Sequence, residues 1–228
     1  MTTIAKNDWF GIPDRSVVLW EIASVISSAI IAEWILVALV GWSKVVIAIP
    51  VCLAFVLMIV SHRERRETLS QLGLRFDNFF RALWLLLPVM LVSAVVLIAV
   101  AYLWGSAVSF SRWGTSRSLV FKLLVSLGWA LVQQYALQAF INRRISMLTG
   151  TNWLSVLLVA GIFAGLHLPN PWLALLTFLG GIVWAAVYQR VPNVFALALS
   201  HGFMTWLVIS TLPPQMLYHM RFGLKYFL

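Results

Sequence analysis

The chain has 228 residues, of which 62% are hydrophobic and 10% are charged, and its mean hydropathy is +0.94. Soluble domains carry about 25% charged and about 45–50% apolar residues. This composition therefore excludes a water-soluble fold and indicates an integral membrane protein. The formal net charge of +9 suits basic loops that set membrane topology, and we expect no nucleic acid partner.

The apolar runs are long and unbroken, which favours helices over the short alternating segments of a membrane β-barrel. We predict an all-α, polytopic membrane helix bundle that forms a single domain over residues 1–228, with about seven transmembrane helices. The predicted spans are Val17–Trp42, Ser43–Ser61, Phe79–Trp104, Leu119–Phe140, Trp153–Leu168, Trp172–Tyr188 and Val194–Ser210. We expect the apolar, aromatic tail, Thr211–Leu228, to lie at the membrane interface.

Basic residues indicate how the bundle is oriented. With seven spans, ten of the sixteen Lys and Arg residues fall on the side of the N-terminus. They include the cluster Arg63, Arg65, Arg66, Arg75 and Arg81, and later Arg143, Arg144 and Arg190. Because cytoplasmic loops are enriched in Lys and Arg, we expect this side and the N-terminus to be cytoplasmic. The compact chain with short loops suits a bacterial inner membrane.

All acidic residues lie at or before Asp77, and the apolar helices that follow carry neutral polar groups instead. In the fourth predicted span, Gln134, Gln138 and Asn142 recur every four residues and share one helical face, with Gln133 beside them. Polar side chains inside a membrane mark either a functional site or hydrogen bonds between helices. Spacing alone favours the second interpretation.

Two later spans each carry a histidine with a partner four residues away. Phe163 precedes His167 in the fifth span, and His201 precedes Thr205 in the seventh. A lone histidine in a membrane is often a buried residue that donates a structural hydrogen bond and has no role in function. Two histidines on separate helices, together with a polar face on a third, are less easily explained in that way.

In their order and internal spacing, these residues resemble the CAAX-protease and bacteriocin-processing (CPBP, or Abi) family of intramembrane endopeptidases. The family carries Glu-Glu-x-x-x-Arg, then Phe-x-x-x-His, then His-x-x-x-Asn. The resemblance covers about residues 119–210, which it implies are the catalytic core of a CAAX-protease-like bundle. The segment Leu72–Phe80 also resembles the family.

The resemblance implies a role for each matching position. The catalytic positions are Gln133, Gln134, His167 and His201. The supporting or substrate-binding positions are Gln138, Phe163 and Thr205. Glutamines stand where the family has its two glutamates and its arginine, and Thr205 stands where it has Asn. Two negative charges and one positive charge are lost together, which avoids a costly unpaired charge in the membrane.

The resemblance also implies a membrane-associated peptide or protein as the substrate, held in the lipid bilayer. We expect no cofactor and no metal, because two histidines without a carboxylate or thiolate make a poor hydrolytic metal site.

The chemistry of the glutamines leaves the function open. A Gln amide cannot accept a proton from water, and the loss of a general base typically costs a factor of about 10²–10⁴ in rate. Three replacements are conceivable: His167 or His201 as the base, Glu21 or Glu33 from the first span, or a metal held by the two histidines. The chain is therefore an active peptidase, a silent protease-like protein that binds membrane peptides or partner proteins, or a small transporter.

Overall fold

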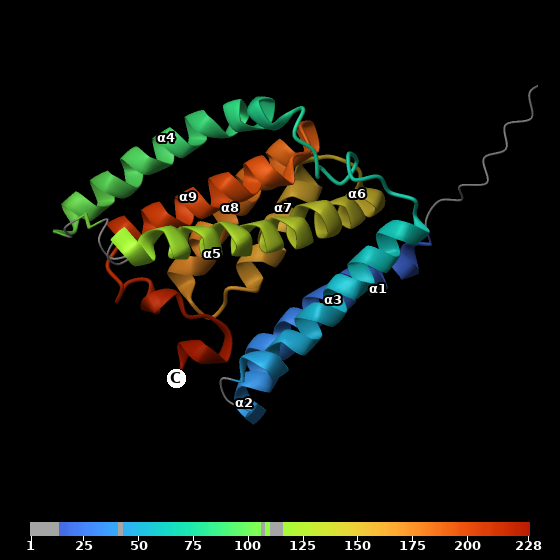
Figure 1. The fold of residues 1–228 in the computed structure, drawn as a ribbon, viewed down its shortest axis with the longest axis horizontal. Coiled ribbons are helices and arrows are strands. Elements are labelled where there is room, and N and C mark those ends of the chain that lie inside the picture. The colour runs from blue at the N-terminus through green and yellow to red at the C-terminus, as the bar shows by residue number, and fades with distance from the viewer. Residues whose placement is uncertain (1–13, 41–42, 106–107, 110–115) are drawn as a thin grey trace, which may run out of the picture.

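The computed structural model describes residues 14–40, 43–105, 108–109 and 116–228. Within these ranges the regular structure is entirely helical (Figure 1), which confirms the predicted all-α class. The helices are arranged as an N-terminal hairpin, α1–α3, that lies against one side of a bundle made by α4–α9. Trp42, the predicted end of the first span, lies outside the described residues.

The N-terminal hairpin is built from two long apolar helices. The first begins as α1 (Arg15–Ile30), continues through a π-helical segment, η1 (Ile31–Leu36), and ends as α2 (Val37–Val40). Asp14 caps its start, because its carboxylate accepts a hydrogen bond from the backbone N–H of Ser16 at 2.9 Å. The second helix, α3 (Lys44–Glu64), returns alongside α1.

The middle of the chain forms α4 (Phe79–Leu103) and then one continuous rod of α5 (Ser116–Gln134), η3 (Tyr135–Asn142) and α6 (Arg143–Thr149). The predicted end of this helix at Phe140 is wrong. The helix continues to Thr149, and Arg143 and Arg144 within it are bound by Glu67 from the loop after α3. The middle segment, η3, is a second π-helical stretch.

The last three helices each begin after an asparagine. They are α7 (Trp153–Gly165), α8 (Pro171–Arg190) and α9 (Val194–Thr211). The side chains of Asn152, Asn170 and Asn193 cap their first turns. The tail then forms two 3-10 turns, η4 (Tyr218–Met220) and η5 (Gly223–Tyr226), and folds back against the bundle, where Gly223 N–H donates to Leu168 O at 2.9 Å.

Among the described residues, six helices are long and apolar enough to cross a membrane. All seven predicted helices are present, but α7 has only 13 residues and is shorter than about 20 residues, the length that a bilayer core requires. Large apolar side chains such as Trp20, Trp84 and Tyr102 remain at least 70% exposed in the fold, as expected where lipid covers the surface. The protein is therefore an integral membrane protein.

Polar contacts gather at one end of the bundle. Glu67 joins the loop after α3 to α6. Asn193, at the start of α9, donates to Arg75 O at 2.7 Å and to Asn78 Oδ1 at 2.6 Å. The start of α1, this loop, α6 and the start of α9 therefore share one end, as the basic residues suggested.

Candidate active site

Amide side chains follow one another along α5 and η3. Gln134 and Gln138 are fully buried, and Asn142 is nearly so, so the predicted shared face points into the bundle. Gln133 precedes this face, is only half-buried, and lines a cavity on the other side of the helix. The two glutamines at the family's glutamate positions therefore lie in different environments.

Gln134 meets His201 where α5 packs against α9. Gln134 Nε2 lies 3.2 Å from His201 Nδ1. When the amide donates this bond, His201 Nδ1 is the acceptor and the ring proton sits on Nε2. Gln134 Oε1 is then a buried acceptor without a hydrogen-bond partner among the described residues. Such an unpaired group costs about 1–3 kcal/mol.

His167, just after the end of α7, has a defined tautomer. Its Nδ1 lies 2.7 Å from the carbonyl oxygen of Phe163, and a carbonyl can only accept, so Nδ1 donates. In the neutral ring, Nε2 then carries the lone pair and can accept a proton or a hydrogen bond. The backbone bond therefore fixes the ring orientation and makes His167 a candidate proton acceptor.

Aromatic rings hold both histidines in place. The Phe163 ring lies edge-on to both, with its centroid 4.8 Å from that of His167 and 5.8 Å from that of His201. Trp184 packs against His201 at 4.4 Å, and its indole N–H donates to Ser200 Oγ at 3.2 Å. Phe163 is thus the side chain that connects the two predicted histidines.

A cavity of about 430 Å³ lies between the hairpin and the bundle. Gln133 and His167 line it from the bundle side, and Glu33 of η1 lines it from the hairpin side. The remaining wall is mostly apolar, with residues such as Phe55, Met58 and Trp129. Gln134 and His201 do not line this cavity, so the predicted catalytic residues form two layers, one facing the cavity and one behind it.

Two predicted supporting residues lie away from the histidines. Gln138 Oε1 accepts a hydrogen bond from Asn142 at 2.7 Å. Asn142 Oδ1 in turn accepts one from Gln189 of α8 at 3.0 Å. This is the bonding between helices that spacing alone favoured. Thr205 lies one turn beyond His201 on α9, is half-buried, and does not line the cavity.

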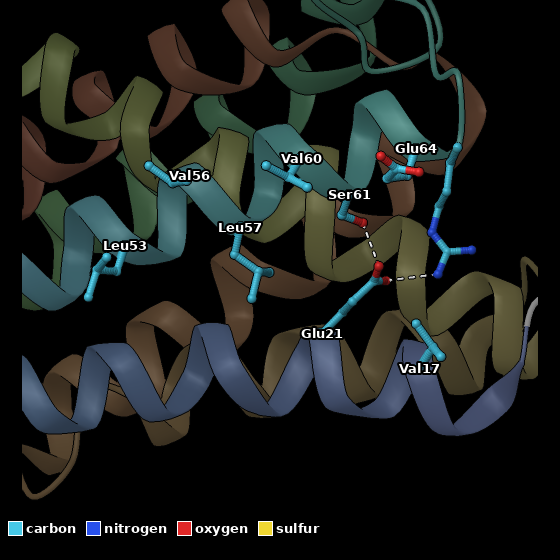
Figure 2. Close-up of a pocket in the computed structure, with 9 residues that line it drawn as sticks. Val17, Glu21, Leu53, Val56, Leu57, Val60, Ser61 and Glu64 are labelled. Atoms are coloured by element: carbon cyan, nitrogen blue, oxygen red, sulfur yellow. Dashed lines mark hydrogen bonds and ion pairs between the residues drawn. The ribbon is translucent and has the colours of Figure 1, made fainter.

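Glu21 and Glu33, the two acidic residues considered from the first span, have different surroundings. Glu21 lies between α1 and α3 (Figure 2), where Ser61 Oγ donates to it at 2.6 Å and Arg65 at 3.1 Å. It does not line the cavity of Gln133 and His167, which excludes it as a carboxylate of that cavity in this structure. Glu33 does line the cavity, and its Oε2 accepts from Lys225 Nζ at 2.7 Å.

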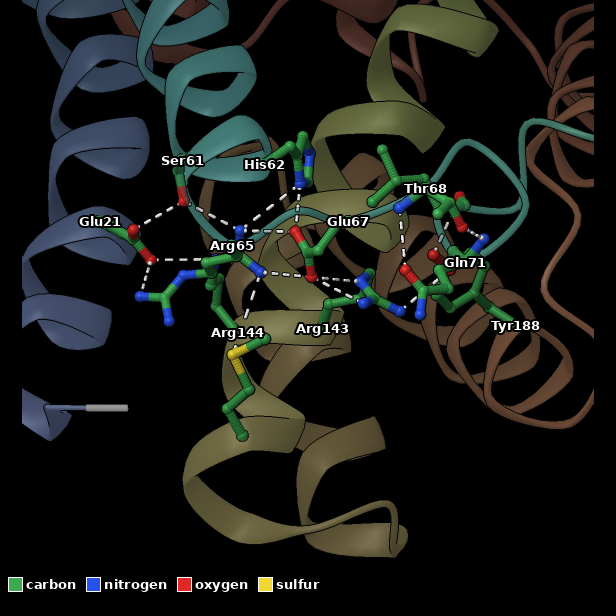
Figure 3. A network of polar contacts seen from close by, with 12 residues as sticks. Glu21, Ser61, His62, Arg65, Glu67, Thr68, Gln71, Arg143, Arg144 and Tyr188 are labelled. Carbon is green, nitrogen blue, oxygen red and sulfur yellow. Dashed lines mark hydrogen bonds and ion pairs between the residues drawn. The ribbon is translucent and has the colours of Figure 1, made fainter. Parts of the chain in front are cut away.

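A polar network anchors the hairpin to α6 (Figure 3). At its centre, Glu67 binds Arg144 at 2.9 Å, Arg143 at 2.6 Å and His62 Nδ1 at 2.5 Å. Arg144 is fully buried and also pairs with Glu21 at 2.9 Å. Burial raises the pKa of Glu67, but hydrogen bonds from His62, Arg144 and Arg143 outweigh it, and the net pKa lies well below its usual range.

The sequence did not indicate that the C-terminal tail reaches the site. Phe222 lines the cavity, and its ring lies 5.0 Å from that of His167. The sequence predicted only that Thr211–Leu228 lies at the membrane interface. Across the part of the chain that the structure describes, no three His, Cys, Asp or Glu side chains are grouped as metal ligands.

Residues 115–207 match a family model described as type II CAAX prenyl endopeptidase, Rce1-like. The match includes all three motifs: the glutamines of α5 and η3, the Phe163–His167 pair, and the His201–Thr205 pair. No characterised protein and no solved structure compared with the chain gave a match. The family match confirms the resemblance inferred from the motifs.

Proposed function

Residues 115–207 match the model of a CAAX prenyl endopeptidase family, and from this match we propose that the protein is an intramembrane endopeptidase. It would hydrolyse one peptide bond in a membrane-associated protein or peptide. The observation that carries the proposal is the convergence of Gln133 and His167 on one cavity, backed by the Gln134–His201 contact at 3.2 Å. Residues from three separate helices thus meet at one place.

Peptide hydrolysis needs a bound water, a group that accepts its proton, and donors for the carbonyl oxygen. Gln133 can orient the water or donate to the carbonyl oxygen, but its amide cannot accept a proton. Between Ser116 and Thr211, His167 and His201 are the only imidazole or carboxylate side chains. Because His201 Nδ1 is engaged by Gln134, His167 Nε2 is the better-placed contact for the water.

A silent pseudoprotease is the second candidate, and the two glutamines favour it. Without a carboxylate at these positions, the expected rate falls by about 10²–10⁴ if no other base replaces it. The mostly apolar cavity would then bind a membrane peptide or partner protein without cutting it.

We further propose that the protein lies in a bacterial inner membrane with its N-terminus in the cytoplasm. The basic cluster after α3, Arg143 and Arg144 support this orientation, because they lie at the same end of the bundle as the start of α1. An excess of Lys and Arg at one end is typical of the cytoplasmic side.

The proposal is tested by incubating the purified protein with a library of membrane-proximal peptides and identifying the products by mass spectrometry. Wild type should cleave a subset, and His167→Ala should remove that cleavage. His219→Ala is the matched control, because His219 is exposed and lies outside the cavity. Cleavage only by Gln133→Glu/Gln134→Glu would instead support the pseudoprotease, and no cleavage by any form would reject the endopeptidase.

A further inference from the structure

The cavity contains one acidic side chain that the family's three motifs do not include. Glu33 belongs to η1, in the N-terminal hairpin, and lines the cavity opposite Gln133 and His167. It lies outside the matched region of residues 115–207. A carboxylate within a membrane-spanning helix is costly and is by default a candidate functional group.

The polar network is a common reference point for the positions of Glu33 and Gln133 along their helices. Glu21 and Arg144 form an ion pair of 2.9 Å, and both helices lead away from it. Glu33 follows Glu21 by 12 residues, and Gln133 precedes Arg144 by 11. At a rise of about 1.5 Å per residue, these offsets are about 18 and about 17 Å. Both residues therefore lie several helical turns from the ion pair, and both line the cavity.

The C-terminal tail links Glu33 to His167. The ring of Phe222 lies 5.0 Å from that of His167. The next residue, Gly223, has a φ of +59°, and a Cβ added there would lie 2.9 Å from the Glu33 carbonyl oxygen. Two residues further on, Lys225 Nζ lies 2.7 Å from Glu33 Oε2. The tail is thus wedged between the end of α7 and η1.

Both walls of the cavity contain a π-helical segment. Glu33 lies inside η1 (Ile31–Leu36), and η3 (Tyr135–Asn142) begins directly after Gln133 and Gln134. π-helical segments are rare, and they are frequent at functional sites. Two of them on opposite sides of one cavity is an observation independent of the charges.

We propose that Glu33 is the general base of this site and replaces the carboxylates that Gln133 and Gln134 lack. This inference rests on the proposed endopeptidase function. Glu33 accepts one proton from a water whose oxygen bonds to the scissile carbonyl carbon, while His167 Nε2 accepts a hydrogen bond from the same water. The C–N bond then breaks, Glu33 returns its proton to the leaving nitrogen, and the products are a carboxylic acid and an amine.

The ion pair with Lys225 is compatible with this role. A carboxylate has about four acceptor positions, so the bond from Lys225 to Oε2 leaves Glu33 able to bind water. The ammonium offsets the cost of an ionised carboxylate in an apolar cavity. Distances between catalytic groups are often long without substrate and shorten in the complex, so Glu33 and His167 need not share a contact in the free protein.

The competing explanation is structural, in which Glu33 only ties the tail to η1. A charge reversal separates the two, because Glu33→Lys/Lys225→Glu keeps an ion pair at this place and moves the carboxylate to the tail. If Glu33 is the base, this double variant melts near the wild-type temperature but does not cleave. If the pair is only structural, both the melting temperature and cleavage return.

The experiment measures kcat and KM for a peptide that wild type cleaves. Glu33→Gln should lower kcat by about 10²–10⁴ with KM nearly unchanged, whereas Glu64→Gln, which removes an exposed carboxylate of α3, should not. Glu33→Gln that retains at least half of the wild-type kcat while His167→Ala abolishes it would overturn the proposal and leave the endopeptidase intact. If wild type cleaves no peptide, both fall together.

Discussion

At the scale of single residues, the two glutamines that replace the family's glutamates are not equivalent. Gln133 is half-buried and faces the cavity, where water and a substrate can reach it. Gln134 is fully buried against His201. A neutral amide avoids placing an ion in that interior, where an unpaired charge is expensive. Loss of charge at Gln134 therefore stabilises the bundle, whereas loss of charge at Gln133 mainly affects chemistry.

This difference predicts unequal effects on stability when each charge is restored. Gln134→Glu should destabilise the protein by about 3–5 kcal/mol if His201 stays neutral, because the new carboxylate is buried without a counterion. Gln133→Glu should cost much less, because the cavity admits water. Thermal melts in the same detergent at pH 7 would measure both, with Gln215→Glu in the exposed part of the tail as the control. Equal melting temperatures for the two variants would contradict the placement of Gln133 at the cavity and Gln134 in the interior behind it.

At the scale of elements, the fold depends on how the hairpin α1–α3 is attached to α6. Glu67 binds two arginines and a histidine in a largely buried network. Its pKa lies below the usual value, so the folded protein holds this proton more weakly than the unfolded chain does. The network therefore stabilises the fold while Glu67 is ionised.

The sign of the shift gives the pH dependence. For a lowered pKa, the stabilisation is complete above the ordinary value of 4.5 and is lost as pH falls toward the lowered value. We expect the wild-type melting temperature to fall below pH 4.5 more steeply than that of Glu67→Gln, which starts lower and lacks this group. Parallel curves for the two proteins would contradict the role of Glu67.

The second attachment is the tail, which docks through Gly223. This residue has a positive φ of +59°, and a Cβ there would clash with the Glu33 backbone at 2.9 Å. Alanine costs about 1–3 kcal/mol for the backbone conformation alone, and the clash adds to this. Gly223→Ala should therefore release the tail and expose it to proteolysis.

Gly105→Ala is the matched control for the tail. Gly105 also has a positive φ, of +65°, but a Cβ there meets nothing within 4 Å. In both variants alanine must adopt a positive φ, and only in Gly223→Ala does the new Cβ also clash with the Glu33 backbone. Limited proteolysis should release a C-terminal fragment faster from Gly223→Ala. Equal cleavage of the two variants would show that the tail is not held by this contact.

At the scale of the whole molecule, long apolar runs were sufficient to predict the helices, because the bilayer requires unbroken apolar segments. The motif spacing also predicted that Gln134, Gln138 and Asn142 share a buried face. The helix end at Phe140 was wrong because Arg143 and Arg144 are paired with residues more than 70 positions earlier. When ion-pair partners are this far apart in the chain, the sequence does not show which charges are paired.

The sequence did not predict the cavity either, because its lining comes from segments that are far apart in the chain. Glu33 was one of two acidic residues considered, and the local pattern of neither showed whether its carboxylate reaches a cavity. The distinction comes from tertiary contacts, since Glu21 meets Arg144 and Arg65 whereas Glu33 meets the tail. The docking of Phe222 and Lys225 likewise depends on the whole bundle.

The most direct test of the central claim, that this site activates water to cut a peptide, is cleavage in H₂¹⁸O followed by mass spectrometry of the products. Hydrolysis places one ¹⁸O atom in the new C-terminal carboxylate of the fragment. We predict this label in wild-type products, with His167→Ala giving no labelled product and His219→Ala giving the wild-type amount. If wild type gives no labelled fragment from a peptide that Gln133→Glu/Gln134→Glu cuts, the protein is a silent relative of the CAAX proteases and the account is wrong.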